Sequence, residues 1–197
     1  GRSTEAHSLV RELSQASAAE VLGVLDGLMQ VAGGVDVKIR RELGELQLQT
    51  AEALKKRLAD LNMDQRLRLD HCFARAYAAT DQPDKAIEVY ESLLRKAPRD
   101  KTLLRTVAEL MIECGSPKCL VGAKSKWKRL ETLEKTGTQP FMEARYHVAL
   151  CCFQLKEFDK CRQLLTVTRI LFPKRGNEAI QEKLKKLEAD VRRQGKK

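Results

Sequence analysis

The chain has 197 residues and a mass of 22.3 kDa, which is enough for one compact domain or a short array of repeats. Val, Ile and aromatic residues are scarce beside Leu, Ala, Glu, Lys and Arg, which argues against a β-sandwich or barrel, and the longest uncharged run, residues 146–155, is too short to cross a bilayer. The net charge is +10, and the whole excess of Lys and Arg lies in residues 118–197.

The first third of the chain predicts three helices and contains no aromatic residue. They are expected near residues 4–15, 17–32 and 36–61. Ser17 and Glu20 have the spacing of a capping box, and Gly33-Gly34 would end the second helix. The third helix is expected to bury one stripe of apolar residues. This stripe consists of Ile39, Leu43, Leu46, Ala53, Leu54, Leu58 and Leu61.

From residue 64 onward, turn and cap residues recur at regular intervals and predict six further helices. Asp64 would cap the first, Pro83 would begin the second, and Asp100, Ser116 and Pro140 would mark the next three. A turn over residues 156–159 separates the fifth from the sixth, which ends before Pro173. A last helix follows over residues 176–194, and its apolar residues keep to one side. We predict no strand.

The helices after residue 64 form an internal repeat. Ala74, Ala108 and Ala149 align, and in the first and third copies Ala86 and Cys161 follow the aligned alanine after twelve residues. The middle copy has three additional residues in its turn. Small residues are needed where two short helices cross closely, and one such pair cannot bury its apolar face alone, so stacking is expected. In the middle copy Trp127 falls on a packing position, which favours a core role over stacking on a nucleic acid base.

This pattern resembles the tetratricopeptide repeat (TPR) family over about residues 64–173. The resemblance rests on Ala74-Arg75-Ala76-Tyr77, Lys85-Ala86-Ile87-Glu88-Val89-Tyr90 and Ala97-Pro98, and on the matching phrases around Ala149, Cys161 and Pro173. It implies an all-α, right-handed superhelical array of helix-turn-helix repeats over residues 64–98, 101–136 and 140–173. Residues 176–194 would be the capping helix, and residues 1–61 a helical cap or an interface with a second copy.

Two of the repeat positions depart from the family. Asp70 and Arg145 stand where it favours a large apolar residue, which affects fine packing rather than the fold.

The resemblance implies a non-catalytic scaffold that binds a protein segment on its concave face, along the first helix of each pair. The residues expected there are Arg68, His71, Arg75, Thr102, Arg105, Thr106, Glu109, Tyr146, Leu150, Phe153 and Gln154. Arginines beside aromatic rings suit an acidic or aromatic-bearing peptide. A subgroup of the family clamps C-terminal carboxylates, but the matching positions here are His71, Arg75, Thr106, Glu143 and His147. Because a glutamate has the wrong sign for that clamp, we reject it.

The alternative function is a nucleic-acid-associated repeat protein that uses the basic residues 118–197. We expect no enzyme, metal site or cofactor, because no phosphate loop, metal-spaced Cys/His set or nucleophile motif occurs. The six cysteines fit small buried residues in a reducing compartment, which favours a cytoplasmic location. For Cys114 and Cys119, a disulfide across a turn and two free thiols both remain open.

Overall fold

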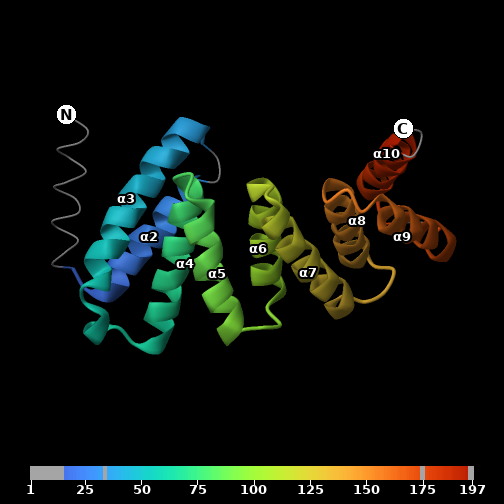
Figure 1. Cartoon of the computed structure of the whole chain (residues 1–197). Helices are drawn as coiled ribbons and strands as arrows, with labels where there is room; N and C mark the ends of the chain where they lie inside the picture. Colours follow the sequence, from blue (N-terminus) through green and yellow to red (C-terminus); the bar gives the residue numbers. More distant parts are fainter. Residues whose placement is uncertain (1–15, 33–34, 174–175, 195–197) are drawn as a thin grey trace. The chain divides into compact units, whose positions relative to one another are not determined.

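The computed structural model describes residues 16–32, 35–173 and 176–194, and every regular element in these ranges is a helix (Figure 1). The bounds are α2 Ala18–Ala32, α3 Val37–Lys55, a 3-10 turn η1 Leu58–Asp60, α4 Met63–Ala79, α5 Pro83–Lys96, α6 Lys101–Cys114, α7 Pro117–Leu133, α8 Gln139–Gln154, α9 Phe158–Leu171 and α10 Glu178–Gln194. The prediction of an all-α fold is confirmed. The helix expected at 4–15 and the glycine stop at 33–34 lie outside the described residues.

The chain divides into two compact units, residues 1–96 (unit 1) and 97–197 (unit 2). In unit 1, α2 and α3 both pack against α4, and α4 packs against α5. The core joins residues from α2, α3, α4 and the segment before α4. Its buried members are Ala18, Val21, Leu22, Leu25, Ala51, Leu54, Leu61, Leu69, Cys72 and Phe73. The first helices of the chain therefore share one core with the first helix of the repeat region.

Helix α3 differs from its prediction in length and in buried face. It ends at Lys55, and a separate 3-10 turn follows, whose carbonyl at Leu58 accepts a hydrogen bond of 2.9 Å from Arg66 Nη2. Ile39 and Leu58 are 43% and 40% exposed, so they do not belong to the buried stripe. The residues that α3 does bury are Gly44, Gln47, Thr50, Ala51 and Leu54.

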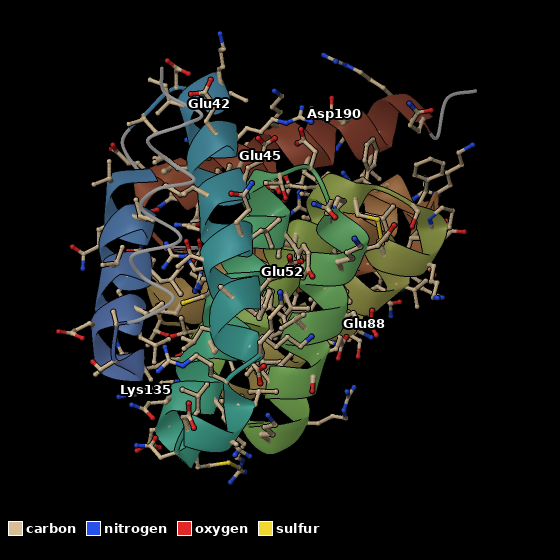
Figure 2. All side chains as sticks on the ribbon, turned by 90° about the vertical axis from the view of Figure 1, so that its left-hand side faces the viewer. Glu42, Glu45, Glu52, Glu88, Lys135 and Asp190 are labelled. Carbon is tan, nitrogen blue, oxygen red and sulfur yellow. A yellow bond between two sulfur atoms is a disulfide. The ribbon has the colours of Figure 1, made fainter. Side chains whose placement is uncertain are left out.

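The reason for this shifted face is the close approach of α3 to α4 at Gly44. A Cβ atom at residue 44 would lie 2.8 Å from the Cβ of Ala79 and 3.0 Å from Cγ2 of Thr80. The lack of a side chain at residue 44 lets the two backbones meet here, and of the leucines of α3 only Leu54 is fully buried, while Leu43, Leu46 and Leu48 are half-buried. On the opposite side of α3, the carboxylates of Glu42, Glu45 and Glu52 are exposed (Figure 2).

Most of the predicted helix starts are present. Ser17 and Glu20 form the expected capping box, in which Ser17 N–H donates to Glu20 at 2.8 Å and Glu20 N–H donates to Ser17 Oγ at 3.3 Å. Asp64 is not a cap. Asn62 caps α4 instead, through a reciprocal pair of hydrogen bonds with Gln65, because an amide oxygen at that position reaches the third helical N–H equally well.

In unit 2, α7 packs against both α6 and α8, α8 packs against α9, and α10 packs against α8 and α9. The alanines that the repeat places at helix crossings, Ala108, Ala123 and Ala149, are at most 1% exposed. Trp127 is fully buried, which confirms its predicted core role. Within the part of the chain that the structure describes, no helix has the length and apolar character needed to span a bilayer.

The two departures from the repeat pattern are compensated by ion pairs. Asp70 pairs with Lys96 on α5 at 3.1 Å. Arg145 is largely buried and pairs with Glu131 on α7, while its Nε donates to Thr168 Oγ1 on α9 at 2.7 Å. The largely buried charge of Arg145 is thus accepted at an apolar position because it is paired and its Nε is hydrogen-bonded.

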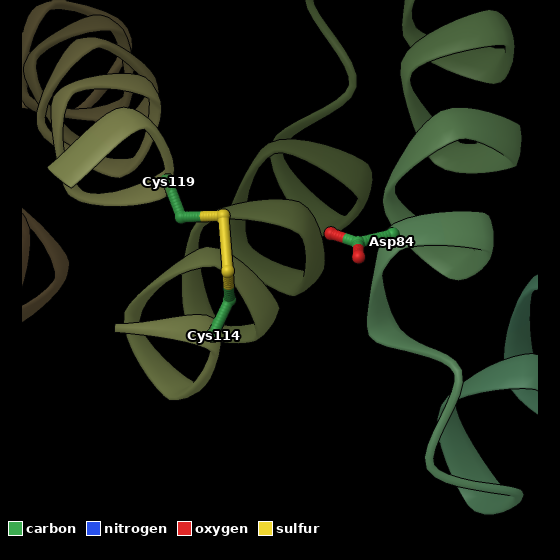
Figure 3. Close-up of side chains that lie close together, drawn as sticks. All are labelled: Asp84, Cys114 and Cys119. Atoms are coloured by element: carbon green, nitrogen blue, oxygen red, sulfur yellow. A yellow bond between two sulfur atoms is a disulfide. The ribbon is translucent and has the colours of Figure 1, made fainter. Parts of the chain in front are cut away.

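A disulfide joins Cys114 at the end of α6 to Cys119 in the first turn of α7, with the two Cα atoms 6.3 Å apart (Figure 3). Between them, Gly115 has a φ of 67° and Ser116 caps α7, so the chain reverses direction within a few residues. The remaining cysteines, Cys72, Cys151, Cys152 and Cys161, are buried free thiols. Of the two alternatives that the sequence left open for Cys114 and Cys119, the structure thus has the disulfide and not two free thiols.

Candidate functional site

In unit 1, the residues predicted to bind a ligand lie on α4. They differ in whether they already interact with other side chains of the chain. Arg68 pairs with Asp26 of α2. The imidazole of His71 lies edge-on to Tyr90, with ring centroids 6.4 Å apart. Arg75 is exposed and forms no ion pair with any described residue of the chain. Of the three, Arg75 has the guanidinium most available to a ligand carboxylate.

In unit 2, the predicted residues of α6 and α8 meet in an ion pair. Arg105 on α6 pairs with Glu143 on α8 at 2.7 Å, and the two side chains are 32% and 30% exposed. Glu109, one turn after Arg105, also interacts electrostatically with both Arg105 and Glu143. Its pKa is raised, chiefly by burial and partly by Glu143, while Arg105 opposes the rise. The surface therefore presents one cation between two carboxyl groups.

Beneath this ion pair lies a stack of aromatic rings. Trp127 and His147 are parallel within 11° at a centroid distance of 4.2 Å, and the Arg105 guanidinium lies 5.6 Å from the Trp127 centroid. Tyr146 lies edge-on to His147 at 5.0 Å. The indole Nε1 of Trp127 and Nδ1 of His147 have no hydrogen-bond partner among the described residues. The Arg105 guanidinium therefore lies against a buried pair of stacked rings.

Burial keeps His147 uncharged at neutral pH. It lowers the pKa of the imidazole to about 4, and the cations Lys183 and Arg105 act in the same direction, whereas Glu143 opposes them. A neutral imidazole can stack on the indole without bringing a buried charge. At neutral pH the charge of this surface is therefore set by Arg105 and its acidic neighbours.

The other predicted residues of α8 are more covered than the repeat pattern suggests. Tyr146, Leu150 and Phe153 are half-buried against a core cluster that includes α10, and only Gln154 is exposed. The ammonium of Lys183 on α10 lies 5.7 Å from the Tyr146 ring centroid. The sequence-based set omitted Lys183, because its position depends on how the last helix packs and not on the repeat.

We use the name α6–α8 cluster for Arg105, Glu109, Glu143, Tyr146 and His147, which all lie in unit 2. Glu143 and His147 also occupy positions that the carboxylate-clamp comparison singled out. Spacing alone could have added them to the predicted surface, since residues 143, 146, 147 and 150 follow one another at helical intervals of three or four.

The free thiols of both units are poor nucleophiles. Burial raises the pKa of Cys72, Cys151 and Cys161 to about 12, and that of Cys152 is raised by the same cause. The thiolate is the reactive form of cysteine, so these side chains are almost entirely protonated at neutral pH. They contribute packing rather than chemistry.

Part of the chain matches a known protein family. A search of curated proteins finds no relative of this chain. The family model described as tetratricopeptide repeat matches residues 67–110, which comprise most of α4, all of α5 and the first part of α6. Together with the all-helical fold and the buried small residues of the repeat, this match identifies a tetratricopeptide repeat within residues 67–110 of the chain.

Proposed function

We propose that this protein is a non-catalytic scaffold whose α6–α8 cluster binds an acidic or aromatic-bearing segment of a partner protein. TPR repeats generally serve protein interaction, and the family is typically non-catalytic. The observation that carries the proposal is the half-exposed ion pair of Arg105 and Glu143 above the Trp127–His147 stack. It offers a donor, an acceptor and a rigid aromatic support within one small area.

The ion pair favours a ligand that offers a hydrogen-bond acceptor and a hydrogen-bond donor side by side. A ligand carboxylate that approaches Arg105 competes with Glu143, so acidity alone gives little net gain. A peptide backbone or tyrosine hydroxyl can instead accept from Arg105 while its own N–H or O–H donates to Glu143. In unit 1, Arg75 offers a separate site of simpler character, a guanidinium for a carboxylate.

The test is a pull-down from nuclease-treated lysate of the source, followed by mass spectrometry. The variant Arg105→Gln/Glu143→Gln removes the ion pair without changing the net charge. Its matched control is Lys101→Gln/Glu134→Gln, which removes a pair of 2.9 Å that also begins on α6. We expect a partner that the wild type and the control retain and the first variant loses. A partner retained equally by all three contradicts the proposal.

Arg75 is tested in the same experiment with Arg75→Glu, for which Arg95→Glu on α5 is the control because both side chains are exposed.

The nucleic-acid alternative has less support. None of the nine aromatic side chains, all of which the structure describes, is exposed, so the described surface lacks a platform on which bases could stack. Capture that disappears with nuclease treatment would favour that alternative.

A further inference from the structure

Two of the six cysteines differ from the other four in their surroundings. Cys114 and Cys119 are half-buried at the turn between α6 and α7, whereas the four free thiols are buried (Figure 3). Exchange between thiols and disulfides needs a thiolate and access for the reagent. Burial raises the pKa of all four free thiols above its ordinary value. Exchange with a dissolved reagent is therefore confined to Cys114 and Cys119.

The turn between α6 and α7 is held by hydrogen bonds that do not involve the disulfide. Gly115, which has a φ of 67°, donates its N–H to the carbonyl of Met111 at 3.4 Å. Ser116 Oγ accepts from the N–H of Cys119 at 3.2 Å, and the carbonyl of Ser116 accepts from the N–H of Leu120 at 2.8 Å. We therefore expect the turn to keep its shape when the sulfur bridge is open, with the two thiols close enough to form it again.

The disulfide adds less to the stability of the fold than a long-range bridge would. A cross-link stabilises a protein mainly by restricting the unfolded chain, and this effect grows with the number of residues in the closed loop. Cys114 and Cys119 are only five positions apart in the sequence, in a turn that has its own helix caps. The bond can consequently open and close without unfolding the chain.

The two sulfur atoms belong to opposite ends of helices and differ in how well they carry a negative charge. Cys119 lies in the first turn of α7, where the free N–H groups stabilise an anion, where no acidic residue occurs and where Lys118 is exposed. Cys114 is the last residue of α6, beside Glu113 and free carbonyl groups, and no basic residue lies in that turn. In the reduced pair the thiolate therefore forms more readily on Cys119.

We propose that Cys114 and Cys119 are a redox-active pair that exchanges reversibly with small disulfides and thiols, with Cys119 as the attacking and Cys114 as the resolving cysteine. The thiolate of Cys119 attacks one sulfur of a disulfide RSSR, whose S–S bond breaks, and one RS⁻ leaves. Cys114 then loses its proton and attacks Sγ of Cys119 in this mixed disulfide, and the second RS⁻ leaves. The two RS⁻ take up the two protons, so two electrons pass from the protein to RSSR. An excess of RSH reverses both steps.

The redox-active pair shares no residue with the α6–α8 cluster. Its chemistry needs a small disulfide or thiol and no partner protein. The proposal therefore does not depend on the proposed function, and each can fail without the other.

The experiment starts from the full chain, which is treated with dithiothreitol in the absence of denaturant and then freed of the reductant. Oxidised glutathione is added, the reaction is stopped at intervals with iodoacetamide, and mass spectrometry locates each modification. We expect alkylation of Cys114 and Cys119 before the addition and their disulfide afterwards. The four buried cysteines should react at least about a hundredfold more slowly.

Cys114→Ser and Cys119→Ser are matched variants that each retain one sulfur of the pair. Because Cys114→Ser lacks the resolving thiol, it should accumulate one glutathione on Cys119. Cys119→Ser should acquire glutathione on Cys114 at least about fivefold more slowly, since the thiolate is less favoured there. Circular dichroism should show the same helicity in the reduced and the oxidised chain, and a serine variant that loses helicity is replaced by the corresponding alanine variant.

Three results would overturn the proposal. The first is a disulfide that dithiothreitol leaves intact without denaturant, or whose reduction unfolds the chain, because the bond is then a structural cross-link. The second is a reaction of Cys114 in Cys119→Ser that is as fast as that of Cys119 in Cys114→Ser, which contradicts the assigned roles. The third is the transfer of glutathione to the buried cysteines at a comparable rate, because the surroundings of the pair then confer no selectivity.

Discussion

At the scale of single residues, Arg145 and His147 of α8 show two ways in which a titratable side chain can be buried. Arg145 keeps its charge, since Glu131 and Thr168 satisfy it. His147 gives up its charge, and a neutral ring stacks on Trp127. Arg145 is thus buried as a charged group in an ion pair, whereas His147 is buried as a neutral imidazole.

Replacing Arg145 with leucine restores the apolar residue that the repeat pattern favours, yet we expect it to destabilise the chain by about 2 kcal/mol. The cause is Glu131, whose largely buried carboxylate loses its partner. In chemical unfolding, Arg145→Leu/Glu131→Leu should recover most of the loss, because no unpaired charge remains. If the single variant is as stable as the wild type, the ion pair does not contribute to the fold.

The pKa of His147 predicts a loss of stability in mild acid. The pKa lies below that of an unfolded histidine, so the unfolded chain binds the proton first as the pH falls. Stability is complete above about pH 6.5 and decreases by roughly 3 kcal/mol toward pH 4. Unfolding midpoints measured across this range should decline less steeply in His147→Phe, which keeps a ring on Trp127. Equal slopes would show that His147 is not the responsible group.

At the scale of helices, the contact of α3 with α4 depends on the lack of a side chain at residue 44. Gly44→Ala should destabilise the chain by about 2 kcal/mol, because its new Cβ meets the Cβ of Ala79, which cannot rotate away. Gly23→Ala on α2 is the control, since nothing lies within 4 Å of its Cβ. It should stabilise the chain by about 0.5 kcal/mol through helix propensity. Thermal unfolding of both variants shows whether the steric clash at residue 44 outweighs the higher helix propensity of alanine. A Gly44→Ala variant more stable than the wild type would contradict the clash.

The helices themselves were predictable because their boundaries depend on local chemistry. Ser17, Asp100 and Ser116 cap helices within three residues of their own position, so spacing suffices to find them. The buried face of α3 was not predictable in the same way. Seven apolar residues of similar spacing compete for burial there, and the contact chosen runs through Gly44 and Ala51, which a hydrophobic pattern ranks last.

The residues of the candidate site were predictable where the repeat pattern alone assigns them to a helix. Arg105 and Tyr146 occupy the helices expected of them. What the pattern could not supply are partners from outside the repeat, such as Asp26 beside Arg68 or Lys183 beside Tyr146. These contacts depend on the packing of α2 and α10, for which the repeat prescribes no register.

At the scale of the whole molecule, the first helices matter because they complete the core of unit 1. Leu69, Cys72 and Phe73 of α4 pack in one cluster with residues of α2 and α3. Removing residues 1–61 should expose them, so we expect residues 62–197 to aggregate in light scattering and to lose helicity in circular dichroism. A truncated chain that stays monomeric with its remaining helicity intact would contradict this. If the full chain is a dimer and the truncated one a stable monomer, residues 1–61 are an interface instead.

The disulfide at the turn between α6 and α7 has a consequence for the integrity of the chain. Lys118 is exposed and lies inside the loop that Cys114 and Cys119 close. A protease that cuts after Lys118 divides the backbone, yet the sulfur bridge still connects the two pieces. The nicked protein would migrate as one species on a denaturing gel and separate into two fragments only after a reductant is added.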